Sequence, residues 1–326
     1  MARDRMKFTG ELSAALRWFL AGVLLPVPPA VYADMARGTH RVFKSTDQGR
    51  SWSSADSGLP GDARVNALHA AGRVLYAGTD DGIFVSKDAG ASWKALAVNE
   101  KQRRRILSIA SLGDSVYLGT DQSGVLASSD EGESWTPSNQ GLGPWKVWCV
   151  QAVGQTLYAG TDANGVFRSD DRGRSWTDFS EGIPGAAQVF GIASVDETVF
   201  AGLYSNGLYR RAAGSKAWTK VGPVSPLVLT ATRDTLVVGH NPGGIFWSED
   251  LGATWQEGRI ELPGERPVWR LASNGRQVFA GVADGIFYSD DAGRGWTRAE
   301  RGLPSKPPGV SLVVTYDFVL AGVIAE

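Results

Sequence analysis

The stretch Ser45-Thr-Asp-Gln-Gly-Arg-Ser-Trp52 has the pattern Ser-x-Asp-x-Gly-x-x-Trp, and this eight-residue box returns along the chain. The other complete boxes are 86–93, 128–135, 169–176, 248–255 and 289–296. A further segment, 211–218, keeps only the tryptophan. Successive tryptophans, from Trp52 to Trp296, are separated by 41, 42, 41, 42, 37 and 41 residues. A regular period of about 40 residues predicts a fold assembled from repeated supersecondary units.

The residues between boxes also repeat, and they read as short strands. One segment, rich in aromatic and β-branched residues with a glycine that we expect to stop the strand, occurs at 75–78, 116–119, 157–160, 199–202, 236–239 and 278–281. A Gly-Ile-Phe type segment then starts the next strand at Gly82, Gly124, Gly165, Gly207, Gly244 and Gly285. Four short strands per repeat, with no amphipathic helix between them, predict the blades of a β-propeller.

The two ends of the chain complement each other. Residues 39–52 are the second half of a repeat, and residues 310–322 are a first half. Joining them completes one blade from both termini and leaves no exposed sheet edge at the junction. The sequence therefore predicts an all-β fold: a single seven-bladed β-propeller, closed by pairing of its N- and C-terminal strands.

We interpret the box as a hairpin turn with a structural role. Its carboxylate is placed to accept backbone N–H bonds from about two residues further on, its glycine suits a positive φ, and its tryptophan is large enough to fill the space between sheets. A feature that recurs in nearly every blade is typical of a structural element of the repeat rather than of a single functional site. The structural carboxylates are those of Asp47, Asp88, Asp130, Asp171, Asp250 and Asp291.

The boxes resemble the Asp-box, or bacterial neuraminidase repeat, and the resemblance covers residues 39–326. This repeat is found in sialidases, sortilin-type receptors, xyloglucan-cleaving double propellers and seven-bladed photosystem II assembly factors. The resemblance implies the propeller fold strongly. Because the family includes hydrolases, receptors and assembly factors, the function has to be argued from other residues.

Residues 1–33 differ from the repeats. They begin with a net positive segment, continue with an apolar run at 18–27, and end in Val31-Tyr-Ala33. This order predicts a secretory signal peptide cleaved after Ala33, followed by the propeller at 34–326. The apolar run is too short to span a bilayer, for which about 20 residues are needed. We therefore expect an exported protein, periplasmic or extracellular, without a membrane span.

Composition excludes some classes of site. The net charge of −1 does not provide the basic surface that nucleic-acid binding requires. The single cysteine, Cys149, lies in an apolar strand, so we expect a core residue rather than a nucleophile. The histidines at 40, 69 and 240 have no metal-ligand spacing, and we expect neither a metal nor a cofactor.

If the boxes occupy one face of the ring, the variable loops occupy the other, and binding residues belong there. We expect them to be Arg103, Arg104, Arg105, Trp145, Trp148, Tyr204, His240, Arg266, Trp269 and Arg270. The same loops carry Lys146, Asp162, Gln188 and Phe190. Arginine and aromatic side chains are enriched in protein interfaces, and aromatic rings also stack on sugars.

A glycoside hydrolase is the enzyme class that these loops allow. The Arg-Ile-Pro segment of sialidases does not occur here, and Tyr76, Tyr117 and Tyr158 share one repeated strand position that reads as core, which leaves Tyr204 on a loop. Two carboxylates from among Asp121, Asp162 and Asp284 could still form an acid pair about 5 to 10 Å apart.

The function that we favour from the sequence is a non-enzymatic, assembly-factor-like propeller that grips a polypeptide partner, such as a subunit of a larger complex, through its arginine- and tryptophan-lined face. The alternative is a carbohydrate-active protein, either a glycoside hydrolase or a lectin-like glycan binder.

Overall fold

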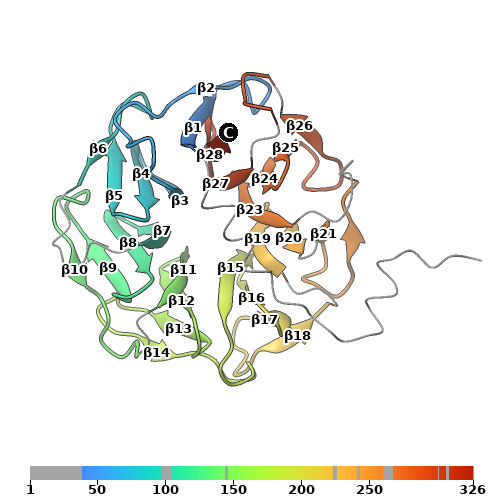
Figure 1. Cartoon of the computed structure of the whole chain (residues 1–326). Helices are drawn as coiled ribbons and strands as arrows, with labels where there is room; N and C mark the ends of the chain where they lie inside the picture. The colour runs from blue at the N-terminus through green and yellow to red at the C-terminus, as the bar shows by residue number, and fades with distance from the viewer. Residues whose placement is uncertain are drawn as a thin grey trace, which may run out of the picture. The chain divides into compact units, whose positions relative to one another are not determined.

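The computed structural model describes residues 39–96, 105–143, 146–222, 226–240, 243–259, 267–299, 301–305 and 308–325. In this part of the chain, every regular element is a strand, and the strands form seven four-stranded antiparallel sheets arranged as a ring of blades (Figure 1). The protein is a seven-bladed β-propeller, as the sequence predicts.

Six blades follow one another along the chain, and in each the first strand is innermost. Blades 1 to 3 contain β3 (Val65–Ala71), β4 (Val74–Thr79), β5 (Ile83–Ser86) and β6 (Lys94–Ala95); β7 (Ile106–Leu112), β8 (Ser115–Thr120), β9 (Val125–Ser128) and β10 (Thr136–Pro137); and β11 (Val147–Val153), β12 (Thr156–Thr161), β13 (Val166–Ser169) and β14 (Thr177–Asp178). Blades 4 to 6 contain β15 (Val189–Val195), β16 (Thr198–Leu203), β17 (Gly207–Arg211) and β18 (Thr219–Val221); β19 (Pro226–Ala231), β20 (Leu236–His240), β21 (Ile245–Ser248) and β22 (Gln256–Glu257); and β23 (Val268–Ser273), β24 (Val278–Val282), β25 (Gly285–Ser289) and β26 (Thr297–Ala299).

Blade 7 is shared by the two ends of the chain, which confirms the predicted closure. Its inner strands are β27 (Gly309–Val314) and β28 (Val319–Ala325), and its outer strands are β1 (Thr39–Ser45) and β2 (Ser53–Ser54). β1 and β28 pair without interruption from Thr39 opposite Ala325 to Ser45 opposite Val319. In Figure 1 the blue β1 and the red β28 lie side by side.

The hydrophobic core is divided among the interfaces between neighbouring blades. One cluster combines Val42 and Leu320 of blade 7 with Leu75 and Trp93 of blade 1, and each of the other clusters likewise joins two adjacent blades. The repeated tyrosines at 76, 117 and 158 are 1%, 1% and 6% exposed, so they are core residues as expected. Burying such apolar area supplies the main force that holds the blades together.

The repeated Ala-Gly segment has a different explanation from the one that we expected. Its glycine does not stop the strand, because β4, β8 and β12 each continue to the following threonine. A Cβ at Gly281 would lie 2.5 Å from Gly309 O, and one at Gly160 would lie 2.8 Å from Val189 O. The glycine therefore lets the innermost strand of the next blade approach the backbone closely.

Box 128–135 shows how the turn is held. The Ser128 hydroxyl donates to Asp130 Oδ1 at 2.7 Å, and the Gly132 amide donates to Ser128 Oγ at 2.8 Å. Ser134 donates its amide to Asp130 Oδ1 at 2.9 Å and its hydroxyl to Oδ2 at 2.5 Å. The carboxylate thus reaches an amide four residues on, rather than two. The turn uses positive φ at Gly132 (91°) and also at Glu131 (58°), where we did not predict it.

The box tryptophans connect one blade to the blade before it. Trp176 is 3% exposed, its indole N–H donates to Ser138 O at 2.8 Å, and its backbone N–H donates to Gln140 O at 2.8 Å. Trp93 and Trp218 make the equivalent indole bonds, whereas Trp52, Trp255 and Trp296 donate to a glycine carbonyl of their own box. Trp218 lacks the polar turn but keeps this packing.

A glycine motif that we did not recognise in the sequence supports the same connection. A Cβ at Gly141 would lie 2.2 Å from Trp176 O, and Gly141 has φ of 80°. The equivalent glycines in Gly-Leu or Gly-Ile segments are Gly58, Gly182 and Gly302, each against the next tryptophan's carbonyl. Only glycine fits where the backbone is both left-handed and this close to its neighbour.

Removing residues 315–326 should abolish the folded ring rather than fray one blade. The truncation deletes β28, the strand between β1 and β27, so both termini lose their partner. We expect loss of the cooperative thermal transition followed by circular dichroism. A chain that starts at Asp34 and keeps its C-terminus is the control, and a truncated protein that melts like this control would refute the closure.

Substituting Asp130 by Ala should lower Tm by about 2–4 °C, as expected when one hydrogen-bonded turn is lost. The Ser134 hydroxyl and amide bonds lower the pKa of Asp130 to about 2, so the carboxylate stabilises the fold above its ordinary pKa of 3.8. This contribution is lost as the pH falls toward 2. Scanning calorimetry between pH 7 and pH 2 is the measurement, and a variant whose Tm deficit is unchanged at acid pH would contradict this assignment.

Candidate binding face

The antiparallel blades separate the boxes from the loops. In blade 1, the box joins β5 to β6 at one end, whereas the loop between β4 and β5 and the connection entering β3 lie at the other. All blades share this order, so the variable loops and the chain entering each innermost strand lie on one face, which we call the loop face.

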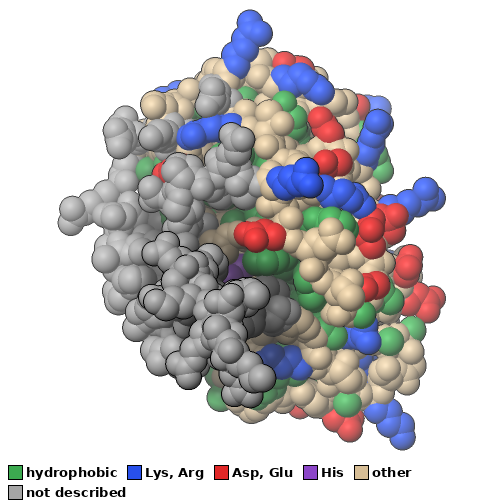
Figure 2. All heavy atoms as spheres, turned by 90° about the vertical axis from the view of Figure 1, so that its right-hand side faces the viewer, with side chains coloured by type: hydrophobic (Ala, Val, Ile, Leu, Met, Phe, Trp, Pro, Cys, Tyr) green, Lys and Arg blue, Asp and Glu red, His purple; other side chains and the backbone are tan. Residues whose placement is uncertain are grey.

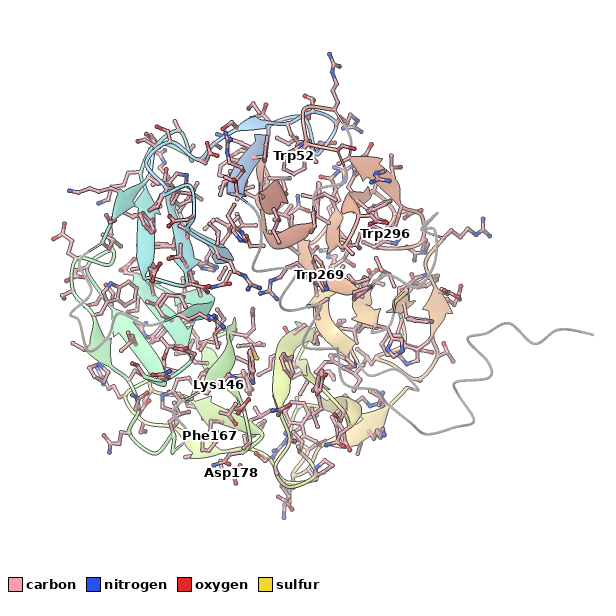
Figure 3. The ribbon with its side chains drawn as sticks, in the orientation of Figure 1. Trp52, Lys146, Phe167, Asp178, Trp269 and Trp296 are labelled. Carbon is pink, nitrogen blue, oxygen red and sulfur yellow. The ribbon has the colours of Figure 1, made fainter. Side chains whose placement is uncertain are left out.

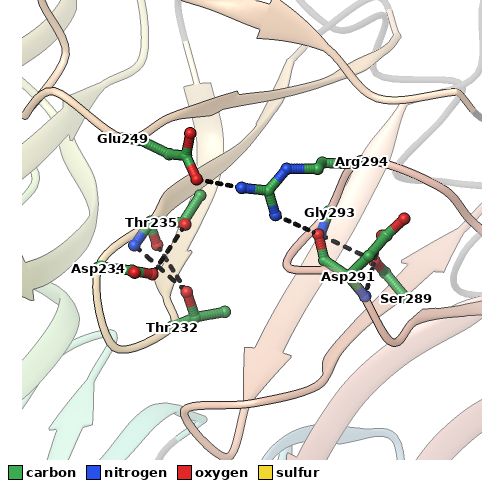
Figure 4. A network of polar contacts seen from close by, with 8 residues as sticks. All are labelled: Thr232, Asp234, Thr235, Glu249, Ser289, Asp291, Gly293 and Arg294. Carbon is green, nitrogen blue, oxygen red and sulfur yellow. Dashed lines mark hydrogen bonds and ion pairs between the residues drawn. The ribbon is translucent and has the colours of Figure 1, made fainter.

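The box face is held by contacts between neighbouring blades. Arg294 donates to the carbonyl of Asp291 in its own box at 2.6 Å and forms an ion pair with Glu249 in the preceding box (Figure 4). Lys87 forms a similar pair with Glu131. The charged side chains of Arg294 and Lys87 are therefore paired with neighbouring boxes, which is the arrangement expected of a structural scaffold.

The innermost strands form a closed ring in which each contacts the next: β3, β7, β11, β15, β19, β23 and β27, which returns to β3. Each has a register shift at its loop-face end, so one residue per strand is left out of the ladder. We call these residues the collar: Asn66, Leu107, Trp148, Phe190, Leu227, Trp269 and Val310. A β-bulge re-aims the side chain of its extra residue, and Asn66, Leu107, Trp148, Phe190 and Trp269 are the collar residues whose side chains the structure describes.

Two collar residues and one loop residue form an aromatic row across blades 3 and 4. The rings of Trp148 and Phe190 are stacked with centroids 4.5 Å apart. Phe190 in turn contacts Tyr204, which follows β16, at 5.2 Å between centroids. We call these three residues the aromatic shelf. All three side chains are partly exposed, an arrangement typical of interface anchors.

Asp162 fixes the shelf in place. Its Oδ1 accepts hydrogen bonds from the Trp148 indole N–H at 2.8 Å and from the Gln188 amide at 3.2 Å. The Lys146 ammonium lies 3.6 Å from the same oxygen and 3.7 Å from the centre of the Trp148 ring. One carboxylate therefore orients an indole, an amide and a cation together.

Two further cations, Arg105 and Arg270, lie at the loop-face ends of the innermost strands of blades 2 and 6. Arg105 Nε is 2.9 Å from Asp80 Oδ1, which also accepts a hydrogen bond from the Asn66 side chain at 2.8 Å. Arg270, which follows the collar residue Trp269, donates to Asn66 O at 3.0 Å and so connects blades 6 and 1 past blade 7. Figure 3 shows Lys146 and Trp269 nearer the middle of the ring than Phe167 and Asp178.

The remaining expected binding residues are divided by position. His240 ends β20, and its ring meets Phe246 edge-on at 6.2 Å. Arg103, Arg104, Trp145 and Arg266 lie outside the described residues. Phe190, Lys146, Asp162 and Gln188 were expected on this face but not among the binding residues. For Lys146, Gln188 and Phe190 the signal is a position next to the residue that starts an innermost strand, whereas Asp162 follows the second strand of its blade.

Two described acids, Asp80 and Asp162, and the cysteine have structural surroundings. Asp162 and Asp80 are each shared by several donors, and burial raises the pKa of the Cys149 thiol to about 12. Within the described ranges, no group of three or more His, Cys, Asp or Glu side chains is placed to hold a metal ion. The same part of the chain contains no helix able to cross a membrane.

Charged side chains of both signs are interspersed on the side of the molecule in Figure 2, in keeping with the net charge of −1. The described residues on this side form no large field of a single sign, the feature that nucleic-acid recognition uses.

Comparison with known proteins gives the fold. A family model described as the DUF6242 beta propeller domain matches residues 30–139, which is less than half of the chain. No curated protein matches the sequence.

Solved structures share the architecture at low sequence identity. The structure of YCF48 bound to D1 peptide has a TM-score of 0.64 and 16% identity, over 82% of this chain and 94% of that one. The structure of YCF48 from Cyanidioschyzon merolae has a TM-score of 0.61 and 15% sequence identity, over 81% of this chain and 96% of that one. The GH74 xyloglucanase from Xanthomonas campestris has a TM-score of 0.62 and 12% sequence identity, over 89% of this chain and 56% of that enzyme.

Substituting Asp162 by Ala should loosen the aromatic shelf without unfolding the ring, because the carboxylate lies on a loop and orients Trp148 rather than packing in the core. Fluorine NMR of fluorotryptophan-labelled protein, with the resonance assigned by Trp148→Phe, should show a shifted and broadened Trp148 signal. Asp178→Ala, a rim substitution, is the control. An unchanged Trp148 resonance would show that the carboxylate does not hold the shelf.

The chain is therefore a seven-bladed β-propeller, and its fold is that of the structures it resembles.

Proposed function

We propose that this propeller is a non-enzymatic binding protein that grips a polypeptide with its loop face. The observation that carries the proposal is the aromatic shelf, in which Trp148, Phe190 and Tyr204 are partly exposed, contact one another in a row, and are anchored at Trp148 by the bond to Asp162. Large, rigid aromatic side chains provide contact area at small entropic cost, which is how interface anchors act.

Two further observations support a polypeptide. Arg105 and Arg270 lie at the same opening, and arginine is enriched in protein interfaces together with tryptophan and tyrosine. A propeller of similar extent, YCF48, was solved with a D1 peptide bound. By analogy, and in line with the resemblance to assembly factors, the bound segment belongs to a subunit of a larger complex.

The proposed place of action is outside the cytoplasm. It rests on the leader at 1–33, whose positive start, apolar run and small-residue end are those of a signal peptide. The mature protein would then meet its partner in the periplasm or outside the cell.

The test is affinity capture from the exported fraction of the native host, with bound polypeptides identified by mass spectrometry. Wild type is compared with a variant carrying Arg105→Ala, Trp148→Ala and Trp269→Ala. The control is Tyr316→Ala, which removes an aromatic side chain that is 85% exposed in the β27–β28 turn, at the box end of its blade. Circular dichroism verifies that all three proteins are folded.

A defined polypeptide that is retained by wild type and the control, and lost by the triple variant, is the expected result. Equal retention by the triple variant would refute the loop face as the binding surface. If wild type retains no polypeptide but binds on a glycan array, the carbohydrate-active alternative replaces this proposal.

A further inference from the structure

We infer that the collar selects an apolar or aromatic side chain of the partner, flanked by acidic residues, and that the aromatic shelf is the subsite that holds it. This inference rests on the proposed function and specifies what the bound polypeptide must contain.

The first argument is the composition of the bulge positions. The register shift recurs in every innermost strand, so the collar is a property of the fold, whereas the residue types at it are a choice of this sequence. By residue type, all collar positions but one are apolar, and Leu107, Trp148, Phe190 and Trp269 have partly exposed side chains. The exception, Asn66, is 8% exposed and donates to Asp80. Apolar side chains that stay partly exposed at the same end of neighbouring blades are suited to contact with a partner.

The second argument concerns what the shelf can accept. Phe190 stacks on the Trp148 indole, and the Lys146 ammonium lies over the same ring. A sugar needs an open ring face on which to stack, and these neighbours already lie against the indole. An aliphatic or aromatic side chain can instead pack on ring edges, which favour edge-to-face contacts.

The third argument is charge. The residue just before the innermost strand is cationic in three consecutive blades: Arg64, Arg105 and Lys146. The Arg105 side chain is 48% exposed and its partner Asp80 is 33% exposed, so the cation is the more accessible member of the pair. Arg105 and Arg270 therefore favour carboxylates beside the inserted residue, whereas Lys146 and its partner Asp162 are about equally exposed, at 35% and 37%.

The experiment uses the full-length mature chain and a phage-displayed library of random linear peptides. Selected peptides are synthesised, and their affinities are measured by calorimetry for wild type, Trp148→Ala, Phe190→Ala, Trp148→Phe and the control Tyr316→Ala. We expect selected peptides to share an aromatic or large aliphatic residue with acidic neighbours. Loss of a shelf side chain should weaken binding by about tenfold or more, as for an interface anchor.

Trp148→Phe keeps an aromatic ring at the shelf but loses the indole bond to Asp162, so it should weaken binding less than Trp148→Ala does. This milder variant protects the test if an alanine variant fails to fold. Selected peptides that lack an apolar residue, or that bind the shelf variants as tightly as wild type, would overturn this inference and leave the proposed function standing. If wild type selects no peptide, the proposed function itself fails.

Discussion

The contact between a box and the blade before it is the interaction on which the ring depends, and in three boxes it includes a bond to a backbone carbonyl of the turn. The residue after the box Asp adopts a left-handed conformation, and its carbonyl then faces the preceding blade. Lys44 donates to Ala89 O at 2.7 Å, Tyr117 to Arg172 O at 2.8 Å and Arg210 to Leu251 O at 2.8 Å. Ser, Asp and Gly of the box hold the turn in the one conformation that presents this carbonyl, and the tryptophan packs beside it.

The residue types on the loop face can differ between blades because the box face supplies the repeated contacts that stabilise the ring. Every blade is held to its neighbours by a box tryptophan and an apolar interface, and every blade except the one that contains Trp218 adds the same polar turn. The loops at the other end therefore carry little of the stability. Substitutions there are free to serve binding. The collar combines both properties: its backbone position comes from the repeat, and its side chains differ from blade to blade.

Much of the fold could be predicted from the sequence because it depends on local, repeated signals. Trp52 to Trp296 give the period, and the half repeats at both ends give the closure. Details that depend on neighbouring blades could not be read in this way. The glycine in Ala-Gly is required by the next blade's backbone, and Gly141 by a tryptophan carbonyl across an interface. The sequence predicted on which face of the ring the site lies, but not how its side chains are arranged. The contact of Trp148 with Phe190 depends on bulges that shift the register of the two strands. The positions of Arg103 and Arg266 stay predictions.

The shared blade has a consequence for the order of events during synthesis. β1 is among the first segments of the propeller to be made, and its partner β28 is the last. The six intervening blades can assemble on their neighbours as they emerge, but the ring stays open until the final strand is available. Pairing segments this far apart in the chain is intrinsically slow, so closure is the step at which a newly made molecule is most exposed to wrong partners.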